Sequence, residues 1–413
     1  MKRVAVTGLG VVAPGGNDPE EFFASLVAGR SSIGPLREDW TSRLATRIAA
    51  RAAFDGSAHF RAPQLRLLDR VSQLALVAAK QAIASAGIDW TDETRASTGV
   101  FLGTGMGGSA TTDEGYATLY RDGSDRIKPF TVLTAMNNAA AAWIASENGL
   151  IGPNLTYSTA CSSSAIAIGE AWLRVRSGGA PLALAGGAEA PLTLGTLKAW
   201  EALKTLAAED PVDAAASCKP FARDRSGLVL GEGAAVVVLE EWQHALRRKA
   251  EIFGEIVGYG LTTDTAHITR PSVEGQARAL ELALASARAA PRDVGYINAH
   301  GTGTAANDAV ETSAIKRVFG TRAKKVPVSS TKSMHGHLLG AAGAVELVVT
   351  LLALRSGTLP PTLNLRVPDP ECDLDYVPNA AREGCDVELA LTSSFAFGGT
   401  NAVLACRKVS RSD

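Results

Sequence analysis

Short apolar runs rich in β-branched residues alternate along this chain with longer stretches rich in alanine. The runs at residues 233–239 and 252–257 have the length and composition of strands that are buried on both faces. The stretches at residues 72–86 and 275–289 have the composition of helices. This alternation predicts an α/β protein.

The pattern restarts near the middle of the chain. A basic cluster at residues 244–250 is typical of the end of a solvated helix, and residues 251–260 then repeat the strand and glycine turn predicted for the first ten residues. We therefore place a boundary there, between an N-terminal half of residues 1–250 and a C-terminal half of residues 251–413.

A turn of related sequence occurs in each half, at residues 156–161 and 328–332. If the chain is a duplicated α/β unit, a pseudo-twofold axis would bring both turns to one cleft. The distance along the chain from the opening strand to the turn is longer in the first half. That half is therefore expected to carry insertions, within residues 30–135.

The composition is that of a large globular protein without a dominant charge. A chain of 413 residues with 46% hydrophobic residues can bury a large core. A net charge of -1 creates no global field that would attract nucleic acid or an anionic membrane. We expect no nucleic-acid partner, and an acidic protein partner would need a local basic patch.

Cysteine usage points to a reducing compartment. The cysteines are odd in number and form no C-x-x-C pair, which argues against a zinc site or a disulfide framework: Cys161, Cys218, Cys372, Cys385 and Cys406. The longest apolar run, residues 344–354, contains Glu346 and is too short to span a bilayer. These observations predict a cytoplasmic protein without a bound metal or a membrane span.

The candidate nucleophile is Cys161, which follows a predicted strand at residues 154–158 and opens a run of small apolar residues. At a strand-to-helix turn, free backbone N–H groups and the helix dipole lower a cysteine pKa from about 8.5 to roughly 3.5–7.5. The competing interpretation is a small buried hydrophobe, which is the common fate of a free cysteine.

Three further side chains are presented from strand ends in the same way. His300 lies in a loop of glycines and threonines, and Lys332 and His337 lie at a second strand–turn–helix junction. These coordinated placements favour the nucleophile over the buried hydrophobe. The histidines elsewhere fit ordinary core or surface positions: His59, His244 and His267.

In combination, these segments resemble the condensing enzymes of the thiolase superfamily, specifically the β-ketoacyl-acyl carrier protein synthase II group. The motifs that carry the resemblance occur in order along nearly the whole chain, at residues 4–10, 103–108, 161, 185–189, 220–227, 230–233, 300–304, 332–346 and 394–401. The resemblance implies a thiolase fold, with a duplicated five-layer α-β-α-β-α architecture. It also implies a dimer, usually a homodimer, with a heterodimer that includes a ketosynthase-like partner as the alternative.

The family's reaction is a decarboxylative Claisen condensation, which gives a 3-oxoacyl-acyl carrier protein. By resemblance, Cys161 takes the acyl group and its N–H forms an oxyanion hole with that of Phe397. His300 and His337 would hold the malonyl thioester oxygen by donating from Nε2. Lys332 would orient and tune His300. No cofactor is implied, because the carrier protein supplies the phosphopantetheine arm.

The resemblance also implies substrate and partner contacts. Contacts to the pantetheine arm and the acyl chain are expected at Thr302, Thr304, Met106, Thr131, Trp200, Phe395, Gly398 and Gly399. An acidic acyl carrier protein would dock on a local basic patch formed by Arg66, Arg126 and Lys204. For each of these three cations alone, ordinary surface charge is the competing interpretation.

Two positions depart from the family pattern. His335 stands where threonine is usual, and would either face solvent or compete for the hydrogen bonds of His337. Ala396 stands where glycine is usual, and its Cβ should stiffen the gate loop and slow acyl loading. With Ser162 and Ser163 after the nucleophile, these departures leave fatty-acid elongation and a specialised polyketide or polyene pathway both open.

Several other functions compete with this interpretation. Ketosynthase-like subunits without the cysteine act as non-catalytic chain-length partners in heterodimers, but Cys161 is intact here. Degradative thiolases use a second cysteine, yet Cys385 and Cys406 lie away from the loop at residues 397–400. The synthase III group pairs its cysteine with one histidine and an asparagine, not with two histidines.

Further polar motifs have structural interpretations. Ser162, Ser163 and Ser164 lack a G-x-S-x-G context and fit capping or packing at a helix N-terminus. Glu346 fits a structural anchor or a buried ion site. Asp308 and Glu311 fit support of the His300 loop. The glycines of residues 103–108 lack the lysine of a nucleotide-binding loop, so we expect no nucleotide.

Overall fold

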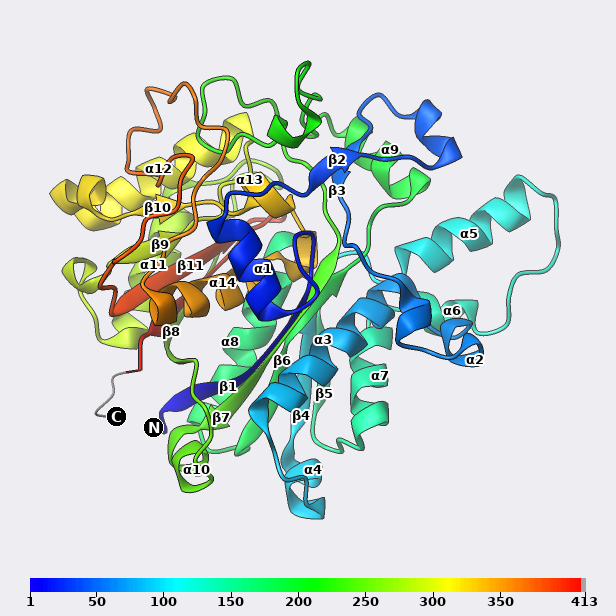
Figure 1. Cartoon of the computed structure of the whole chain (residues 1–413), viewed down its shortest axis with the longest axis horizontal. Coiled ribbons are helices and arrows are strands. Elements are labelled where there is room, and N and C mark those ends of the chain that lie inside the picture. Colours follow the sequence, from blue (N-terminus) through cyan, green and yellow to red (C-terminus); the bar gives the residue numbers. More distant parts are fainter. Residues whose placement is uncertain (410–413) are drawn as a thin grey trace.

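Ten strands form one hydrogen-bonded array in the computed structural model, which describes residues 1–409 (Figure 1). From edge to edge they are β10 (Val328–Ser329), β9 (Tyr296–Asn298), β11 (Leu389–Phe395), β12 (Thr400–Arg407), β8 (Gly254–Thr263), β1 (Val4–Val12), β7 (Gly233–Glu241), β6 (Leu182–Glu189), β4 (Gly99–Gly103) and β5 (Asn154–Tyr157). β1 and β8 pair at only two positions, so the array divides into two five-stranded halves.

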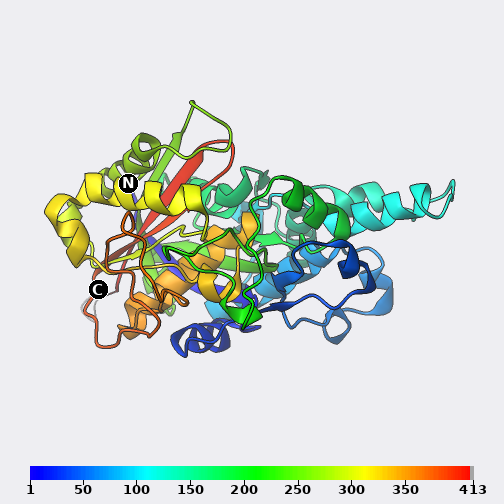
Figure 2. The same ribbon diagram turned by 90° about the horizontal axis from the view of Figure 1, so that it is seen from above.

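Helices form three layers around these halves (Figures 1 and 2). The outer layer on the N-terminal half contains α3 (Arg70–Ala86) and α7 (Ala139–Asn148). The middle layer contains α8 (Ser163–Arg176) and α14 (Ala342–Ser356), which contact strands of both halves. The outer layer on the C-terminal half contains α11 (Val273–Ala287) and α12 (Ala305–Phe319). The five-layer α-β-α-β-α architecture is thereby confirmed.

The two halves have the same strand order. It is β1-β7-β6-β4-β5 in the first and β8-β12-β11-β9-β10 in the second. β5 and β10 therefore occupy equivalent edge positions, and each leads into a segment that carries candidate chemistry. The turn after β5 carries Cys161, and β10 is followed by α13 (Lys332–His335).

Extra segments distinguish the first half, and all but the helix Pro19–Val27 lie within the predicted residues 30–135. Between β1 and α3 lie α1 (Pro19–Val27), a hairpin of β2 (Ile33–Pro35) and β3 (Ile48–Ala50), and α2 (Ala62–Leu65). Between β4 and α7 lie α5 (Ser109–Tyr120) and α6 (Thr131–Ala135), and α5 projects from the body of the molecule (Figure 2). The other helices are α4 (Asp92–Ser97), α9 (Leu194–Ala202) and α10 (Trp242–Arg247).

The glycines predicted to form turns near residues 8–10 and 258–260 instead lie inside strands, which corrects that expectation. A Cβ on Gly8 or Gly10 would overlap backbone oxygens of α3, and a Cβ on Gly258 or Gly260 would overlap those of α11. Both strands thus need glycine because a helix crosses them at backbone contact distance. The same solution in both halves explains why the two sequences look alike there.

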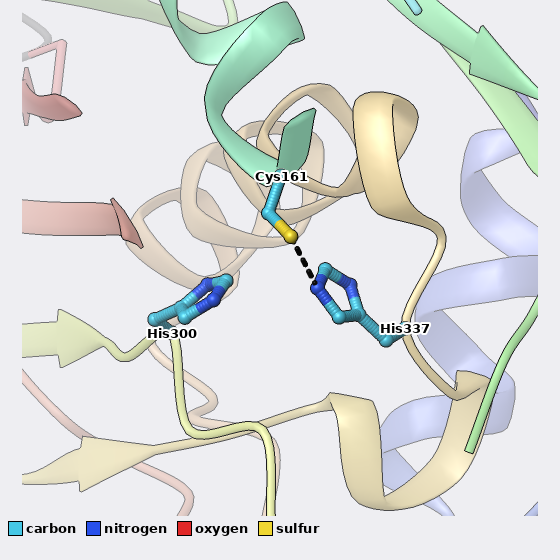
Figure 3. A group of neighbouring side chains, drawn as sticks. All are labelled: Cys161, His300 and His337. Atoms are coloured by element: carbon cyan, nitrogen blue, oxygen red, sulfur yellow. Dashed lines mark hydrogen bonds between the residues drawn. The ribbon is translucent and has the colours of Figure 1, made fainter. Parts of the chain in front are cut away.

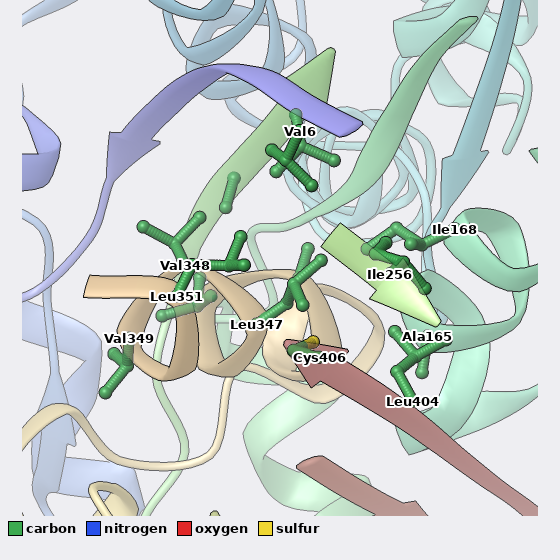
Figure 4. Packing of buried hydrophobic residues seen from close by; sticks show 14 of the residues in the cluster. Val6, Ala165, Ile168, Ile256, Leu347, Val348, Val349, Leu351, Leu404 and Cys406 are labelled. Atoms are coloured by element: carbon green, nitrogen blue, oxygen red, sulfur yellow. The ribbon is translucent and has the colours of Figure 1, made fainter. Parts of the chain in front are cut away.

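The central helix α14 packs in the middle of the core (Figure 4). Leu347, Val348 and Leu351 lie near Val6 of β1 and Cys406 of β12 in this cluster. The stretch Leu339–Ser356 is long and apolar enough to cross a membrane by length and composition, but 83% of it is buried inside the protein. Its hydrophobicity is accounted for by its place between two sheets.

Candidate active site

Cys161 lies in a sharp turn between β5 and α8, within a short 3-10 segment (Ala160–Ser162). Ala160 adopts a φ of 50°, which is uncommon for a residue with a side chain. The Ser163 hydroxyl donates to the Ala160 carbonyl at 2.6 Å and accepts from the Thr159 N–H at 2.9 Å. The serines after the cysteine therefore hold the turn in place, as the structural interpretation predicted.

His337 faces the cysteine directly (Figure 3). Its Nε2 lies 3.0 Å from Sγ of Cys161, and its Nδ1 accepts a hydrogen bond from the Leu339 N–H at 3.2 Å. Because Nδ1 is an acceptor, the proton of the neutral ring must be on Nε2. His337 thus presents an N–H donor to the space beside the sulfur.

His300 approaches the same space from the loop after β9 (Figure 3). The backbone N–H groups of His300 and Gly301 donate to the Glu311 carboxylate at 2.7 and 2.8 Å. Asp308 accepts from the Phe221 N–H at 2.8 Å and from the Gly303 N–H at 3.3 Å. Both acids therefore support the loop, as their positions in the sequence suggested.

Lys332 lies behind His300, with Nζ 3.4 Å from Nδ1 of the ring. Its ammonium also forms an ion pair with Glu346, and neither side chain has any exposed surface. A lysine ammonium can only donate, so Nδ1 of His300 accepts and the ring proton is on Nε2. Glu346 is thus the anchor of Lys332.

Burial controls the protonation of all three reactive groups. It lowers the pKa of His300 and of His337 well below the usual value, and the positive charge of Lys332 lowers both further. It raises the pKa of the Cys161 thiol to about 12, against the opposing effects of Lys332 and of the Phe397 N–H, which bonds to the sulfur. The lowered cysteine pKa expected from the helix N-terminus is therefore wrong for this buried thiol.

The ligand atoms of Cys161, His300 and His337 lie within 4.8 Å of one another, a spacing that a metal ion could bridge. A histidine that binds a metal through Nε2 normally carries a proton on Nδ1 and donates it. Here Nδ1 of His337 instead accepts a hydrogen bond from the Leu339 N–H. The hydrogen bonds of the site therefore suit two N–H donors better than two metal ligands.

A cavity opens onto these three residues. Of the residues expected to bind substrate, its wall includes Thr302, Thr304, Phe395 and Gly399, together with the gate residue Phe397. Met106, Trp200, Thr131 and Gly398 are absent from this wall. Trp200 lies close by, with its ring stacked on that of Phe397 at a centroid distance of 6.0 Å.

The basic residues expected to dock a carrier protein are exposed. Arg66 lines one surface hollow and Arg126 another, and the two hollows share Thr111, Glu114, Lys128 and Thr131. Lys204 lies outside both hollows, just after α9. The structure thus brings two of the three cations together.

A loop between β8 and α11 was missed in the sequence, although it supplies part of the cavity wall, including Asp264 and Arg270. The N–H of Asp264 donates to the Gly399 carbonyl at 2.7 Å, and the Gly398 N–H donates to the Ile268 carbonyl at 2.8 Å. These contacts join the loop to the glycines after Phe397. The position of this loop directly after a strand could have indicated in the sequence that it belongs to the site.

The two departures from the family pattern also have defined positions. His335 is fully buried and bonds through Nε2 to the Thr331 hydroxyl at 2.9 Å, so the solvent-facing alternative is wrong. It does not compete for the hydrogen bonds of His337, because Nδ1 of that ring accepts from the Leu339 N–H and its Nε2 lies 3.0 Å from Sγ of Cys161. Ala396 has an ordinary negative φ, and its N–H donates to the Thr400 carbonyl at 3.0 Å.

Family comparison gives a consistent result over most of the chain. The model described as "Beta-ketoacyl synthase, N-terminal domain" matches residues 1–245, and "Beta-ketoacyl synthase, C-terminal domain" matches residues 253–366. Nodulation protein E of Rhizobium meliloti (strain 1021) is 43% identical, over 99% of this chain and 100% of its own length. The 3-oxoacyl-[acyl-carrier-protein] synthase 2 of Coxiella burnetii is 41% identical, over 99% of each.

A solved structure shares the fold at similar coverage. It is a type II polyketide synthase ketosynthase, bound to a hexaketide and in complex with its acyl carrier protein. The TM-score is 0.91, with 32% sequence identity over 99% of this chain and 100% of that one.

Proposed function

Because the chain belongs to the β-ketoacyl synthase family, we propose that Cys161 carries the growing acyl group while His300 and His337 act on the malonyl thioester. The enzyme is an acyltransferase that condenses an acyl group with malonyl-acyl carrier protein in fatty-acid or polyketide elongation. The observation that carries the proposal is the convergence of one thiol and two Nε2–H donors in one buried space.

In the first step, Sγ of Cys161 attacks the carbonyl carbon of an acyl-carrier protein thioester. The new S–C bond forms, the bond to the pantetheine sulfur breaks, and the thiol proton leaves with the pantetheine thiol. The backbone N–H groups of Cys161 and Phe397 stabilise the oxyanion.

In the second step, malonyl-carrier protein occupies the space next to acylated Cys161. Nε2–H of His300 and Nε2–H of His337 both donate to the malonyl thioester oxygen as CO₂ leaves and enolate charge develops there. The enolate carbon then attacks the acyl carbonyl, so that a C–C bond forms and the S–C bond to Cys161 breaks. The sulfur leaves as a thiolate and takes up a proton from solvent to regenerate the thiol. The lowered pKa values of His300 and His337 keep both rings neutral. Each ring therefore offers one Nε2–H without becoming a charged imidazolium.

The pantetheine arm enters past Thr302 and Thr304, whose hydroxyls lie 2.9 Å apart on the cavity wall. Phe395, Phe397 and Gly399 form the remainder of this entrance, and Gly398 supports it from behind by donating its N–H to the Ile268 carbonyl. The carrier protein docks on Arg66, Arg126 and Lys204. The pantetheine arm belongs to the carrier protein, so the enzyme requires no cofactor of its own. The enzyme works in the cytoplasm.

A homodimer forms through the free edge of β5, the last strand of the array. Large apolar side chains are exposed beside this edge: Leu133, Met136, Ile151 and Leu155. In that dimer Thr131 reaches the acyl chain from the partner subunit, which explains why it does not line the cavity of a single chain. Met106 lines the acyl tunnel of its own subunit. A heterodimer with a ketosynthase-like partner would use the same edge, but intact Cys161 makes this chain the catalytic member.

Intact-mass spectrometry tests the proposal. The wild type and Cys161→Ala are incubated with acyl-carrier proteins of graded chain length, and then with malonyl-carrier protein. We expect acylation of the wild type alone, followed by a product two carbons longer. Failure of every donor to load, even with candidate partner subunits present, would replace the catalytic role with that of a non-catalytic partner.

A further inference from the structure

Glu189, the last residue of β6, is a buried carboxylate near the active site for which the mechanism has no role. Its four hydrogen-bond donors are all neutral. Oε2 accepts from the Gly105 N–H at 2.6 Å and the Gly340 N–H at 2.9 Å. Oε1 accepts from the Met106 N–H at 2.9 Å and the Thr104 hydroxyl at 3.3 Å.

These donors come from two segments far apart in the sequence. Gly105 and Met106 belong to the loop after β4, and Gly340 belongs to the turn that follows His337. The residue before Gly340 is Leu339, whose N–H bonds to Nδ1 of His337. Oε2 of Glu189 therefore holds both the β4 loop, through the Gly105 N–H, and the Gly340 N–H. The Gly340 N–H is next along the chain to the Leu339 N–H, which fixes the tautomer of His337.

The junction has no free space. A Cβ on Gly340 would overlap the Gly105 nitrogen and lie 2.7 Å from Oε2 of Glu189. A Cβ on Gly105 would lie 2.9 Å from the same oxygen. Movement of the β4 loop must therefore displace the Gly340 turn as well.

We propose that Glu189 is a positioning residue that couples the β4 loop, which carries Met106, to the turn that orients His337. The inference rests on the proposed function, in which Met106 contacts the acyl chain and Nε2–H of His337 stabilises the enolate. It assigns Glu189 to the decarboxylation half-reaction through His337. Acylation of Cys161 by an acetyl group uses backbone N–H groups elsewhere and involves a chain too short to reach Met106, which lies outside the cavity wall at Cys161, so this step is expected to depend on Glu189 much less.

Two substitutions test the coupling from opposite sides. Glu189→Gln keeps the shape but replaces an acceptor oxygen with an amide NH₂, so at least one buried N–H loses its partner. Gly105→Ala leaves the carboxylate in place and pushes against it with one methyl group. Glu240→Gln is the control, because Glu240 is also fully buried but bonds to Thr7 and Arg248 away from the site.

Two half-reactions are measured by mass spectrometry, at a temperature at which the wild type and all variants are folded. One is acylation of Cys161 by acetyl-carrier protein, whose acyl group is too short to reach Met106, and the other is CO₂ loss from malonyl-carrier protein. We expect decarboxylation to fall about tenfold or more in both test variants while acylation changes less than about twofold. The control should match the wild type in both.

A parallel fall in both half-reactions, or an unchanged ratio between them in folded test variants, would overturn the role of Glu189. If Glu189→Gln does not fold, Gly105→Ala decides the question alone. A wild type that neither acylates nor decarboxylates would reject the proposed function itself, which is a different outcome.

Discussion

Lys332 and Glu346 form an ion pair with no exposed side-chain surface, and the same ammonium faces Nδ1 of His300 at 3.4 Å. In such a pair, loss of one partner leaves a buried charge without compensation, which typically costs about 3–5 kcal/mol. We therefore expect the lysine to have two separable roles, one in folding stability and one in orienting His300.

The double variant Lys332→Met/Glu346→Gln separates these roles. Lys332→Met alone should lower the free energy of unfolding by about 3–5 kcal/mol and slow malonyl decarboxylation at least about tenfold. The double variant should regain much of the stability without regaining the rate, because Nδ1 of His300 still lacks its donor. Denaturant unfolding and CO₂ release measure the two effects, and recovery of the rate in the double variant would contradict this division.

Ala396→Gly should speed acylation of Cys161. Ala396 lies between Phe395 and Phe397, and its side chain packs with the apolar cluster around Cys161. Removal of the Cβ frees the backbone by about 0.5–1 kcal/mol, which corresponds to roughly a two- to fivefold faster loading step. Pre-steady-state acylation in a quenched-flow instrument measures it. Equal rates for the two proteins would remove the idea.

His335→Thr should reduce the loss of stability at mildly acidic pH. Burial and the charge of Lys332 lower the pKa of His335 to about 3, whereas the unfolded chain titrates near the usual 6.5. The unfolded state therefore binds the proton first, and stability is lost as pH falls below about 6.5. Between pH 7.5 and 5.5 this contribution is about 1.4 kcal/mol.

Denaturant unfolding at both pH values measures the difference between wild type and variant. The buried acids Glu189, Glu311 and Glu346, each with a pKa raised to about 7, act in the opposite direction but are present in both proteins. An identical pH dependence would show that His335 does not contribute as inferred.

Charge reversal at Arg66, Arg126 and Lys204 should raise the KM for the carrier protein roughly tenfold and leave kcat nearly unchanged. We expect these exposed cations to steer an acidic partner, and such an electrostatic effect should shrink as salt is added. Arg292→Glu serves as the control, since its side chain is 83% exposed on the short 3-10 turn after α11. An unchanged KM in the triple variant would contradict the proposal that the carrier protein docks on these three cations.

Local sequence patterns were sufficient to predict the α/β class and the strand–turn–helix segments that carry Cys161 and His337. They also led to the family, because its motifs are short and depend on neighbouring residues. The glycines near residues 8–10 were misinterpreted as a turn. Glycine is needed there because the backbone of a helix some 70 positions away contacts the strand and leaves no space for a Cβ.

The tertiary structure decided the electrostatics and the fine geometry of the site. The sequence placed Cys161 at a helix N-terminus and so predicted a low pKa, but packing of distant segments removed water and raised it to about 12. The tautomer of His337 and the four donors of Glu189 likewise depend on contacts between distant segments. A sequence thus determines local elements through adjacent residues, whereas dehydration and hydrogen-bond partners arise only when remote segments pack together.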